Sequence, residues 1–286
     1  MFPKGTQFRR GALVVVGDRD STALRTTFEV RATNKGEPNA ATIKVYNPAP
    51  KTAAGWLQER RPDVRLDAGY NGELATIFLG RARTVDQYRE GNDSIVEIRA
   101  GDGEEEIRSA FTSKAVAPDT RGDELLRLLA ADLGVAPGNL NDACARLRAR
   151  NLGSLFSQGG VMFGATARQM DRVCASYGLA WSIQNGALQL VEIGQPKSGK
   201  PVFELSAASG LLGSPRVERV QFNAKAGKHT GETDFDCLLN PLLVPNAVVV
   251  LKSLFVSGNY RLVQVQHNGD THGAGEWKTT CKARTY

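Results

Sequence analysis

The feature that most constrains this fold is a series of short segments in which apolar and polar side chains alternate. In the segment 26–33, TTFEVRAT, the apolar Phe28 and Val30 stand on either side of Glu29. Successive side chains of a strand point to opposite faces, so a period of two indicates a strand with one buried face. The same alternation recurs at 41–47 and 63–70, and further short strands are predicted at 12–17, 75–88 and 93–100.

Turn residues separate these predicted strands. Asn71–Gly72 follows one strand, and REGN (89–92) follows another. Asn-Gly is a strong hairpin signal because both residues tolerate the left-handed backbone of a tight turn. Regular short strands joined by such turns are typical of an antiparallel barrel or sandwich, interrupted here by a predicted helix at 52–60.

The middle of the chain changes to a helical pattern. The segment 121–134 repeats leucine at helical spacing and ends at Gly134, which is well placed as a C-terminal cap. A second helix is predicted over 166–178, and Asn185–Gly186 then turns a hairpin. We expect a small α+β domain here, followed by a linker at 194–201.

Alternating strands return from about residue 202 to the end. This last part has the same layout as the end of the first part: a strand, a tight turn, a long strand, a polar glycine loop and another strand. The layout favours a duplicated barrel split by an insert. The predicted fold is mainly β (α+β overall), with two tube-like β-barrel domains separated by a small α+β insert domain. The predicted boundaries are 1–114, 115–195 and 196–286.

Length and composition exclude several classes of protein. The chain has 286 residues, 41% hydrophobic and 23% charged, which is ordinary for a globular protein. No apolar run approaches the roughly 20 residues of a membrane span, and the start, MFPKGTQFRRG, lacks the apolar core of a signal peptide. The four cysteines are scattered, which predicts buried thiols in a reducing compartment rather than a zinc site or a disulfide framework.

The net charge of +6 raises the question of a nucleic-acid partner. The two densest basic stretches, 59–65 and 146–150, have acidic residues close by. Aromatic residues make up 7% of the chain, and no predicted strand interleaves them with basic residues on one face. We therefore expect a mildly basic surface and no sequence-specific nucleic-acid partner, and we keep a nucleic-acid-binding β-barrel as the alternative.

Two of the three histidines stand beside carboxylates in the stretch 265–277, VQHNGDTHGAGEW. The candidates for a metal site, or for the acid–base pair of a cell-wall hydrolase, are His267, Asp270, His272 and Glu276. The two histidines are five positions apart among glycines, unlike the helical HExxH pattern, and no third ligand is evident. The stretch is therefore predicted to be a surface loop between two strands, as is the sequence around His229.

Other motifs with possible chemistry fail on spacing. GDGEEE (101–106) lacks the ligand spacing of a calcium loop and is predicted to be a solvated turn. GQPKSGKP (194–201) has Pro201 where a phosphate loop requires Ser or Thr. No GxSxG sequence occurs. No catalytic, cofactor-binding or metal-ligating residue is predicted, and the chain is not expected to be an enzyme.

Five segments in a fixed order carry a resemblance to a known family. They are TTFEVRATNKGEPNAATIKVYNPAP, VRLDAGYNGELATIFLGRA, VEIRAGDGEEEIRSAF, TARQMDRVCASYGLAWSIQNGALQLV and the strands from NPLLVPNAVVVLKS to EWKTTCKA. In this order they resemble the baseplate hub proteins of phage tails, the family that includes late control protein D. They also resemble the N-terminal part of the type VI secretion spike proteins (VgrG). The resemblance covers nearly the whole chain, and its specificity lies in the order of the segments rather than in one motif.

The resemblance implies a structural function in the virion. Hubs of this family are trimers in which each subunit contributes two tube-like barrels, and the resulting ring adapts a sixfold tail tube to a threefold spike or fibre. The implied partners are two further copies, the tail tube or distal tail protein, the central spike or fibre protein and a tape measure protein. No cofactor is implied. The chain would be made in the cytoplasm of the bacterial host, and any lytic device would be a separate protein. Because DNA would slide through the ring, the net positive charge is expected on outer and intersubunit faces.

Overall fold

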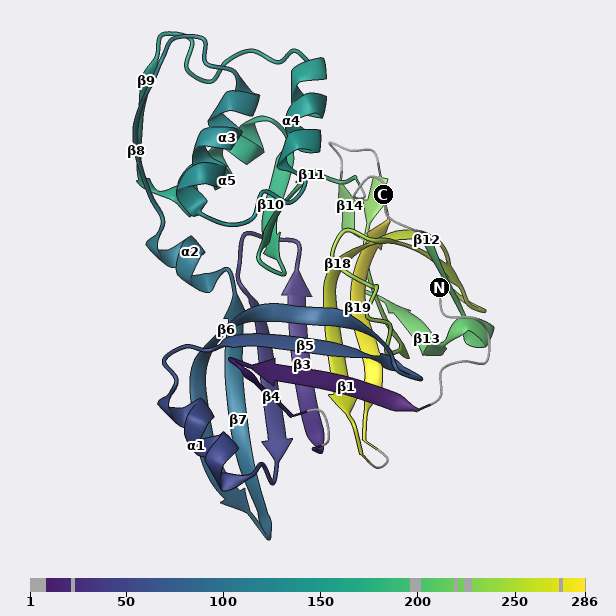
Figure 1. Ribbon diagram of the computed structural model, residues 1–286. Helices are drawn as coiled ribbons and strands as arrows, with labels where there is room; N and C mark the ends of the chain where they lie inside the picture. Colours follow the sequence, from purple (N-terminus) through teal and green to yellow (C-terminus); the bar gives the residue numbers. More distant parts are fainter. Residues whose placement is uncertain are drawn as a thin grey trace. The chain divides into compact units, whose positions relative to one another are not determined.

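The computed structural model describes residues 9–21, 24–195, 202–218, 221–223, 228–272 and 275–285. The chain forms two compact units. The first unit contains the described residues within 1–33, 40–101 and 196–286, and the second contains those within 34–39 and 102–195. A single 13-stranded sheet forms the framework of the first unit (Figure 1).

The N-terminal part of the first unit supplies seven strands and one helix. They are β1 (Arg10–Val16), β2 (Arg19–Asp20), β3 (Thr26–Thr33), β4 (Asn39–Tyr46), α1 (Pro50–Gln58), β5 (Asp63–Tyr70), β6 (Glu73–Glu90) and β7 (Asp93–Asp102). Their order in the sheet is β3-β4-β7-β6-β5-β1-β2. Asn71 and Gly72 both have positive φ, at 52° and 84°, as the predicted hairpin turn requires.

The C-terminal part completes the same sheet. Its elements are β12 (Val202–Ser206), η1 (Ala207–Ser209), β13 (Leu211–Val217), β16 (Glu232–Leu238), β17 (Val248–Lys252), β18 (Ser257–Asp270) and β19 (Trp277–Thr285). The order is β13-β16-β19-β18, with β17 beside β18 and β12 parallel to β17. A separate hairpin consists of β14 (Gln221–Asn223) and β15 (Lys228–Thr230).

The long strand β18 joins the two parts. Its first residues, 257–261, pair with β17, and its last residues, 264–270, pair with β3. The pairing with β19 shifts register between Leu262 and Gln264, where the strand changes partner. Because of this shared strand, the sheet is continuous from the N-terminal part to the C-terminal part.

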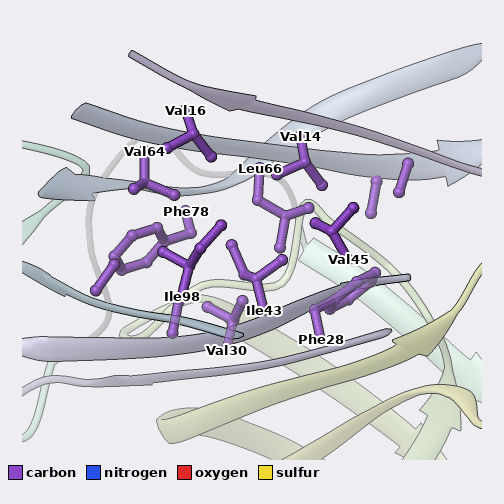
Figure 2. Close-up of a cluster of buried hydrophobic side chains, with 14 of the residues drawn as sticks. Val14, Val16, Phe28, Val30, Ile43, Val45, Val64, Leu66, Phe78 and Ile98 are labelled. Atoms are coloured by element: carbon purple, nitrogen blue, oxygen red, sulfur yellow. The ribbon is translucent and has the colours of Figure 1, made fainter. Parts of the chain in front are cut away.

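Two hydrophobic cores lie along this sheet. The first β-core packs side chains of β1 and β5, such as Val14 and Leu66, toward Val30 and Ile43 of β3 and β4 (Figure 2). The second β-core is formed by the apolar sides of β12, β13, β16, β17, β18 and β19, and includes Phe203, Phe235, Leu251, Leu262 and Cys281. Each fully buried large apolar side chain contributes roughly 1.5–3 kcal/mol, so each cluster can hold its strands together.

A close approach between strands explains one glycine of β18. Gly269 pairs with Phe28 of β3, and a Cβ atom on Gly269 would lie 2.2 Å from the Phe28 ring. The Phe28 ring also meets Trp277 of β19 edge-on, with the ring centroids 5.5 Å apart. Glycine therefore leaves the space that the aromatic pair occupies.

The second unit is a smaller α+β body. Its elements are α2 (Glu104–Ser109), β8 (Phe111–Val116), α3 (Gly122–Leu133), α4 (Leu140–Ala149), β9 (Gly160–Ala165), α5 (Thr166–Ser176), β10 (Leu179–Gln184) and β11 (Ala187–Glu192). The strands form two antiparallel pairs, β8–β9, which is separated in sequence by α3 and α4, and the hairpin β10–β11; both pairs contribute to one core with the three longer helices. The buried carboxylate of Asp123 accepts hydrogen bonds from Arg121 and Arg148, which ties α3 to α4.

Most of the helices and turns predicted for this unit are confirmed. The predicted helices 121–134 and 166–178 are α3 and α5, Gly134 has φ 74°, and Asn185–Gly186 has the positive φ of the predicted turn. Two expectations are corrected. The segment 101–106 was expected to be a solvated turn, but three glutamates begin the short helix α2, where they complement the positive helix N-terminus. The helix α4 was not predicted.

Three further expectations concern the whole chain. The four cysteines are buried and unpaired, as expected. Within the described ranges, no helix has the length and apolar character needed to cross a bilayer. The predicted linker at 194–201 lies mostly outside the described residues.

The compact units differ from the predicted boundaries. The second unit begins at Asp102 rather than at 115 and includes the β3–β4 connection, 34–39. Both flanking parts of the chain belong to one unit because β18 pairs with β3. The division into two barrel domains, 1–114 and 196–286, around an insert at 115–195 stays a proposal, which the two separate β-cores support.

Candidate functional site

The histidine–carboxylate stretch 265–277 is not a loop throughout, which corrects the prediction. Residues 265–270 form the end of β18, and His267 is 3% exposed. Its Nδ1 lies 2.9 Å from Oγ1 of Thr279 on β19. Burial lowers the pKa of His267 to about 4. A backbone hydrogen bond at Leu243 acts to raise the pKa, but its effect is smaller. His267 is therefore a neutral interior residue.

Asp270 lies on the opposite face of β18, because successive side chains alternate. Its carboxylate accepts hydrogen bonds from Nη2 of Arg25 at 2.8 Å, from Nε of Arg25 at 3.3 Å and from the backbone N–H of His272 at 2.9 Å. Burial raises the pKa of Asp270, but the hydrogen bonds and charge of Arg25 reverse this and leave the pKa lowered. The guanidinium of Arg25 also lies 4.6 Å from the ring centroid of Tyr46.

The other two candidates are engaged at the surface. His272 Nδ1 is 2.9 Å from Oγ1 of Thr271, and the carboxylate of Glu276 lies 3.2 Å from Nζ of Lys278. Asp270 and Glu276 line the same surface hollow, whereas His267 is buried on the other side of β18, so the four candidates do not form one cluster. Among the residues that the structure describes, no three His, Cys, Asp or Glu side chains are grouped as metal ligands would be. The side chain of His229 lies outside the described part of the molecule.

A polar surface that the sequence reasoning missed extends across the sheet. It consists of the side chains that point away from both β-cores on six neighbouring strands, and we call it the polar face. Its residues are Glu232, Asp234 and Asp236 on β16; Lys278, Thr280, Lys282 and Arg284 on β19; Gln264, Gln266, Asn268 and Asp270 on β18; Thr27, Glu29 and Arg31 on β3; Thr42, Lys44 and Tyr46 on β4; and Glu97 and Arg99 on β7. The polar members of the alternating strands were the available signal, but their common face follows only from the pairing of β18 with β3.

The charges of the polar face are arranged in pairs along the β16–β19 ladder. Lys282 Nζ lies 3.5 Å from the carboxylate of Asp234, and Lys278 Nζ lies 3.3 Å from that of Asp236. Arg284 pairs with Glu232 at the end of the same ladder. Hydrogen bonds and charge from Glu276 and Asp236 raise the pKa of Lys278, which keeps it cationic.

The pairing continues on the N-terminal side of the sheet. The carboxylate of Glu97 lies 2.7 Å from Nη2 of Arg99 and 3.7 Å from Nζ of Lys44, and it accepts a hydrogen bond from Tyr88 at 3.1 Å. Burial raises the pKa of Glu97, but these partners more than offset it and lower the pKa. Arg31 donates to Oε1 of Gln264 at 3.1 Å across the β3–β18 pairing.

Taken together, the polar face has six acidic and six basic residues. The first unit as a whole contains 26 Lys and Arg against 18 Asp and Glu, whereas the second contains 10 against 12. The net positive charge of the chain therefore comes from the first unit, and the polar face makes no net contribution to it.

A hollow of about 460 Å³ lies on the polar face, where β3, β4 and β18 meet the segment 275–276. Thr27, Glu29, Lys44 and Asp270 are among its lining residues. Asp270 is held by Arg25, and Lys44 lies beside Glu97, so neither charge is directed at a bound reactant. The hollow can form polar contacts with a partner.

The fold has known counterparts, although no family model matches the sequence and no curated protein matches it. It is similar to a tail protein from Neisseria meningitidis MC58, with a TM-score of 0.65 and 9% identity over 97% of each chain. It is also similar to the 43 kDa tail protein of prophage MuSo2 from Shewanella oneidensis, with a TM-score of 0.61 and 7% identity over 96% of this chain and 98% of that one. A third counterpart is an E. coli component of the type VI secretion system described as structurally similar to the T4 bacteriophage tail proteins gp27 and gp5. Its TM-score is 0.59, with 11% identity over 96% of this chain and 76% of that one.

These likenesses define the class of fold: it is the fold of phage tail proteins, mainly β with a smaller helical part. The likeness extends over nearly the full chain and includes a type VI secretion component, so the fold agrees with the family that the ordered sequence segments resemble. The sequence resemblance is thus confirmed at the level of the fold.

Proposed function

We propose that this chain is the structural hub of a phage tail or of a related tail-like particle. The fold it shares with phage tail proteins supports a structural role in a tail. The observation that carries the proposal further is the continuous sheet, which passes through two β-cores and presents one polar face across both. Such a chain offers two β-cores joined by one sheet.

In the proposed assembly, three copies form a ring and contribute six β-cores. Such a ring has threefold symmetry overall but six similar elements, so it can contact a sixfold tail tube on one side and a threefold spike or fibre on the other. The shared strand β18 fixes the spacing of the two cores within a copy. That spacing would keep the six elements in register with the tube.

We propose that the polar face lines the central channel through which DNA passes. Free lysines and arginines bind DNA phosphates by releasing counterions, and a row of them would slow a moving duplex. Five of the six cations of the polar face lie beside carboxylates of the same face, and acidic and basic residues are equal in number, so the face offers few free cations. The excess of basic residues elsewhere in the first unit would then serve outer and intersubunit contacts.

The proposed partners follow from this position. They are two further copies of the chain, the tail tube or distal tail protein, the central spike or fibre protein and a tape measure protein. The chain would be synthesised in the cytoplasm of the bacterial host and would end at the tail tip of the virion. Its role would be non-enzymatic and would need no cofactor, because it acts through shape and adhesion.

Cryo-electron microscopy of particles that carry an epitope-tagged chain tests this proposal. We expect three copies in a ring at the tail tip, with the polar face directed at the axis. A tagged chain found outside the tail, or a ring with the polar face turned outward, would contradict it.

The channel assignment has its own test. In the variant E232Q/D234N/D236N, the basic residues on β19 lose their opposing carboxylates, so filter binding of duplex DNA should strengthen and become steeply salt-dependent. A control variant, D18N/E73Q/E90Q, removes three carboxylates outside the polar face and should change DNA binding little. Tight, salt-sensitive binding by the unaltered chain would favour a nucleic-acid-binding barrel instead.

A further inference from the structure

Two apolar features of the surface stand apart from the polar face. The first is the turn between β17 and β18, where Leu254 and Phe255 are 93% and 83% exposed. The turn is held firmly: the Ser253 N–H and hydroxyl both donate to the carbonyl of Val256, at 3.1 and 2.8 Å, and the Val256 N–H donates to the hydroxyl at 3.0 Å. We call this feature the Leu254–Phe255 turn. Hairpin turns normally carry Gly, Asn, Asp or Pro at such positions, so two large apolar side chains there have no local purpose.

The second feature is one side of the two-stranded sheet β8–β9. Its other side packs Thr112, Val116 and Met162 into the second unit's core. The outward side presents Phe111, Val161 and Phe163, which are 55%, 64% and 67% exposed, with Ser113, Ala115 and Ala165 between them. The rings of Phe111 and Phe163 meet edge-on, with centroids 5.0 Å apart. We call this side the β8–β9 face.

The two features match in chemistry. One is a turn that carries two exposed apolar side chains, and the other is one side of a two-stranded sheet with three. Neither contains an ionisable residue, so bringing them together would desolvate no charge. Phe255 could join Phe111 and Phe163 in an aromatic cluster, an arrangement that adds to the gain from apolar burial.

The exposed apolar area of the two features is about half of what a small stable interface buries. Five side chains, three of them aromatic, together expose on the order of 600 Å². A stable protein–protein interface buries about 1,200–2,000 Å² in total and has a more apolar centre than rim. The two features would supply that centre, and the polar residues around them would supply the rim.

We propose that the Leu254–Phe255 turn of one copy docks on the β8–β9 face of the next copy. Because the turn and the β8–β9 face are different surfaces of the same chain, the contact is heterologous, and a heterologous contact closes into a ring when its rotation allows. This inference deepens the proposed hub and rests on it for the closed ring of three. The occupant of each apolar surface is thus a second copy of this chain.

Mixing two variants of the full chain tests the proposal. L254S/F255S removes the apolar side chains of the turn, and V161S/F163S removes two of those of the β8–β9 face; since all four side chains are exposed, both variants should fold. The unaltered chain should form trimers at high concentration in sedimentation analysis, and each variant alone should be monomeric. An equimolar mixture should form dimers and nothing larger, because only one intact contact remains. I193S, which alters an exposed apolar residue outside both features, should still form trimers.

Cross-linking gives the second arm of the test. A chain with F255C mixed with a chain with F163C should form a disulfide between copies upon mild oxidation, whereas I193C mixed with F163C should not. The inference is overturned if the unaltered chain stays monomeric at the highest attainable concentration, if both double variants still form trimers, or if a chain with both F255C and F163C closes the disulfide within a monomer. Trimers of the double variants that still occupy the tail tip would reject this contact and leave the hub proposal standing.

Discussion

The first and second β-cores belong to one sheet, yet they differ in how much apolar surface they leave to solvent. The first core includes Trp56 of α1, Phe78 of β6 and Trp277 of β19, and among the described residues around it the exposed large apolar side chains are Leu57 and Leu79. The described residues of the part that forms the second core expose six, and they are Val202, Leu212, Val217, Leu242, Leu254 and Phe255. The first core is largely complete in a single chain, whereas the second has surfaces suited to being covered by neighbours.

The largest expected effect comes from breaking the first core. Phe78→Ala removes a ring that is 1% exposed and should cost about 3–5 kcal/mol of unfolding free energy, because the cavity refills only partly. Urea unfolding of the full chain measures it. Leu79→Ala, one position along and 39% exposed, is the matched control and should cost less than about 1 kcal/mol. Equal losses of unfolding free energy in Phe78→Ala and Leu79→Ala would mean that the first core is not tightly packed.

His267 tests whether the two cores unfold together. Its pKa is about 4 in the folded chain against an ordinary value of 6.5. As the pH falls, His267 is therefore protonated at a higher pH in the unfolded chain than in the folded chain. Stability should therefore be unaffected above about pH 6.5 and fall by about 3 kcal/mol between pH 6.5 and 4.

The comparison with His267→Gln isolates this effect from other titrating groups. Urea midpoints at pH 7 and pH 4 should differ by less in His267→Gln than in the unaltered chain, whereas His272→Gln should behave as the unaltered chain does. Since β18 serves both cores, fluorescence and amide exchange should report loss of both at the same pH. Separate transitions would show that the cores are independent.

The packing where β18 meets the first core is tested by Gly269→Ala. The added methyl would collide with the Phe28 ring, and overpacking of this kind costs about 1–3 kcal/mol. Adding Phe28→Leu should make room and recover part of the loss in a double-variant cycle. Gly153→Ala is the control, since a Cβ there meets nothing within 4 Å and should change stability little. The absence of any recovery would reject the steric explanation.

The smallest effect is expected on the polar face. Lys282→Ala breaks the pair with Asp234, whose side chains are 38% and 27% exposed, and should cost less than about 1 kcal/mol. High salt should reduce the difference between Lys282→Ala and the unaltered chain, because solvent ions screen exposed charges. Lys51→Ala, at an exposed position of α1, is the control. A loss comparable to that of Phe78→Ala would mean that the polar face contributes to folding rather than to the channel.

Local patterns predicted most strands, three helices and the two Asn-Gly turns, because alternation and turn chemistry act within a few residues. The missed helix α4 also had a local signal: Leu140, Ala143, Cys144 and Leu147 are its buried residues, and they recur at helical spacing. Asn139, which precedes α4, hydrogen-bonds Leu190 of β11, so the helix is positioned by a strand distant in sequence.

The candidate surface could not be predicted in the same way. The polar members of each strand were visible, but the sheet that aligns them depends on the pairing of β18 with β3. The same pairing decides the position of His267, which a loop prediction placed at the surface. Its partner Thr279 lies on a third strand, and no spacing within 265–277 encodes that contact.

The shared strand also sets an order of events during synthesis. Residues 27–33 leave the ribosome early, but their partners on β18, 264–270, follow more than two hundred positions later. Until then β3 has one neighbour and an open edge, and such edges pair readily with other chains. Closing so distant a contact is slow compared with forming the hairpins that precede it. A chain shortened before Gln264 should therefore aggregate through β3 even though most of the first core is present.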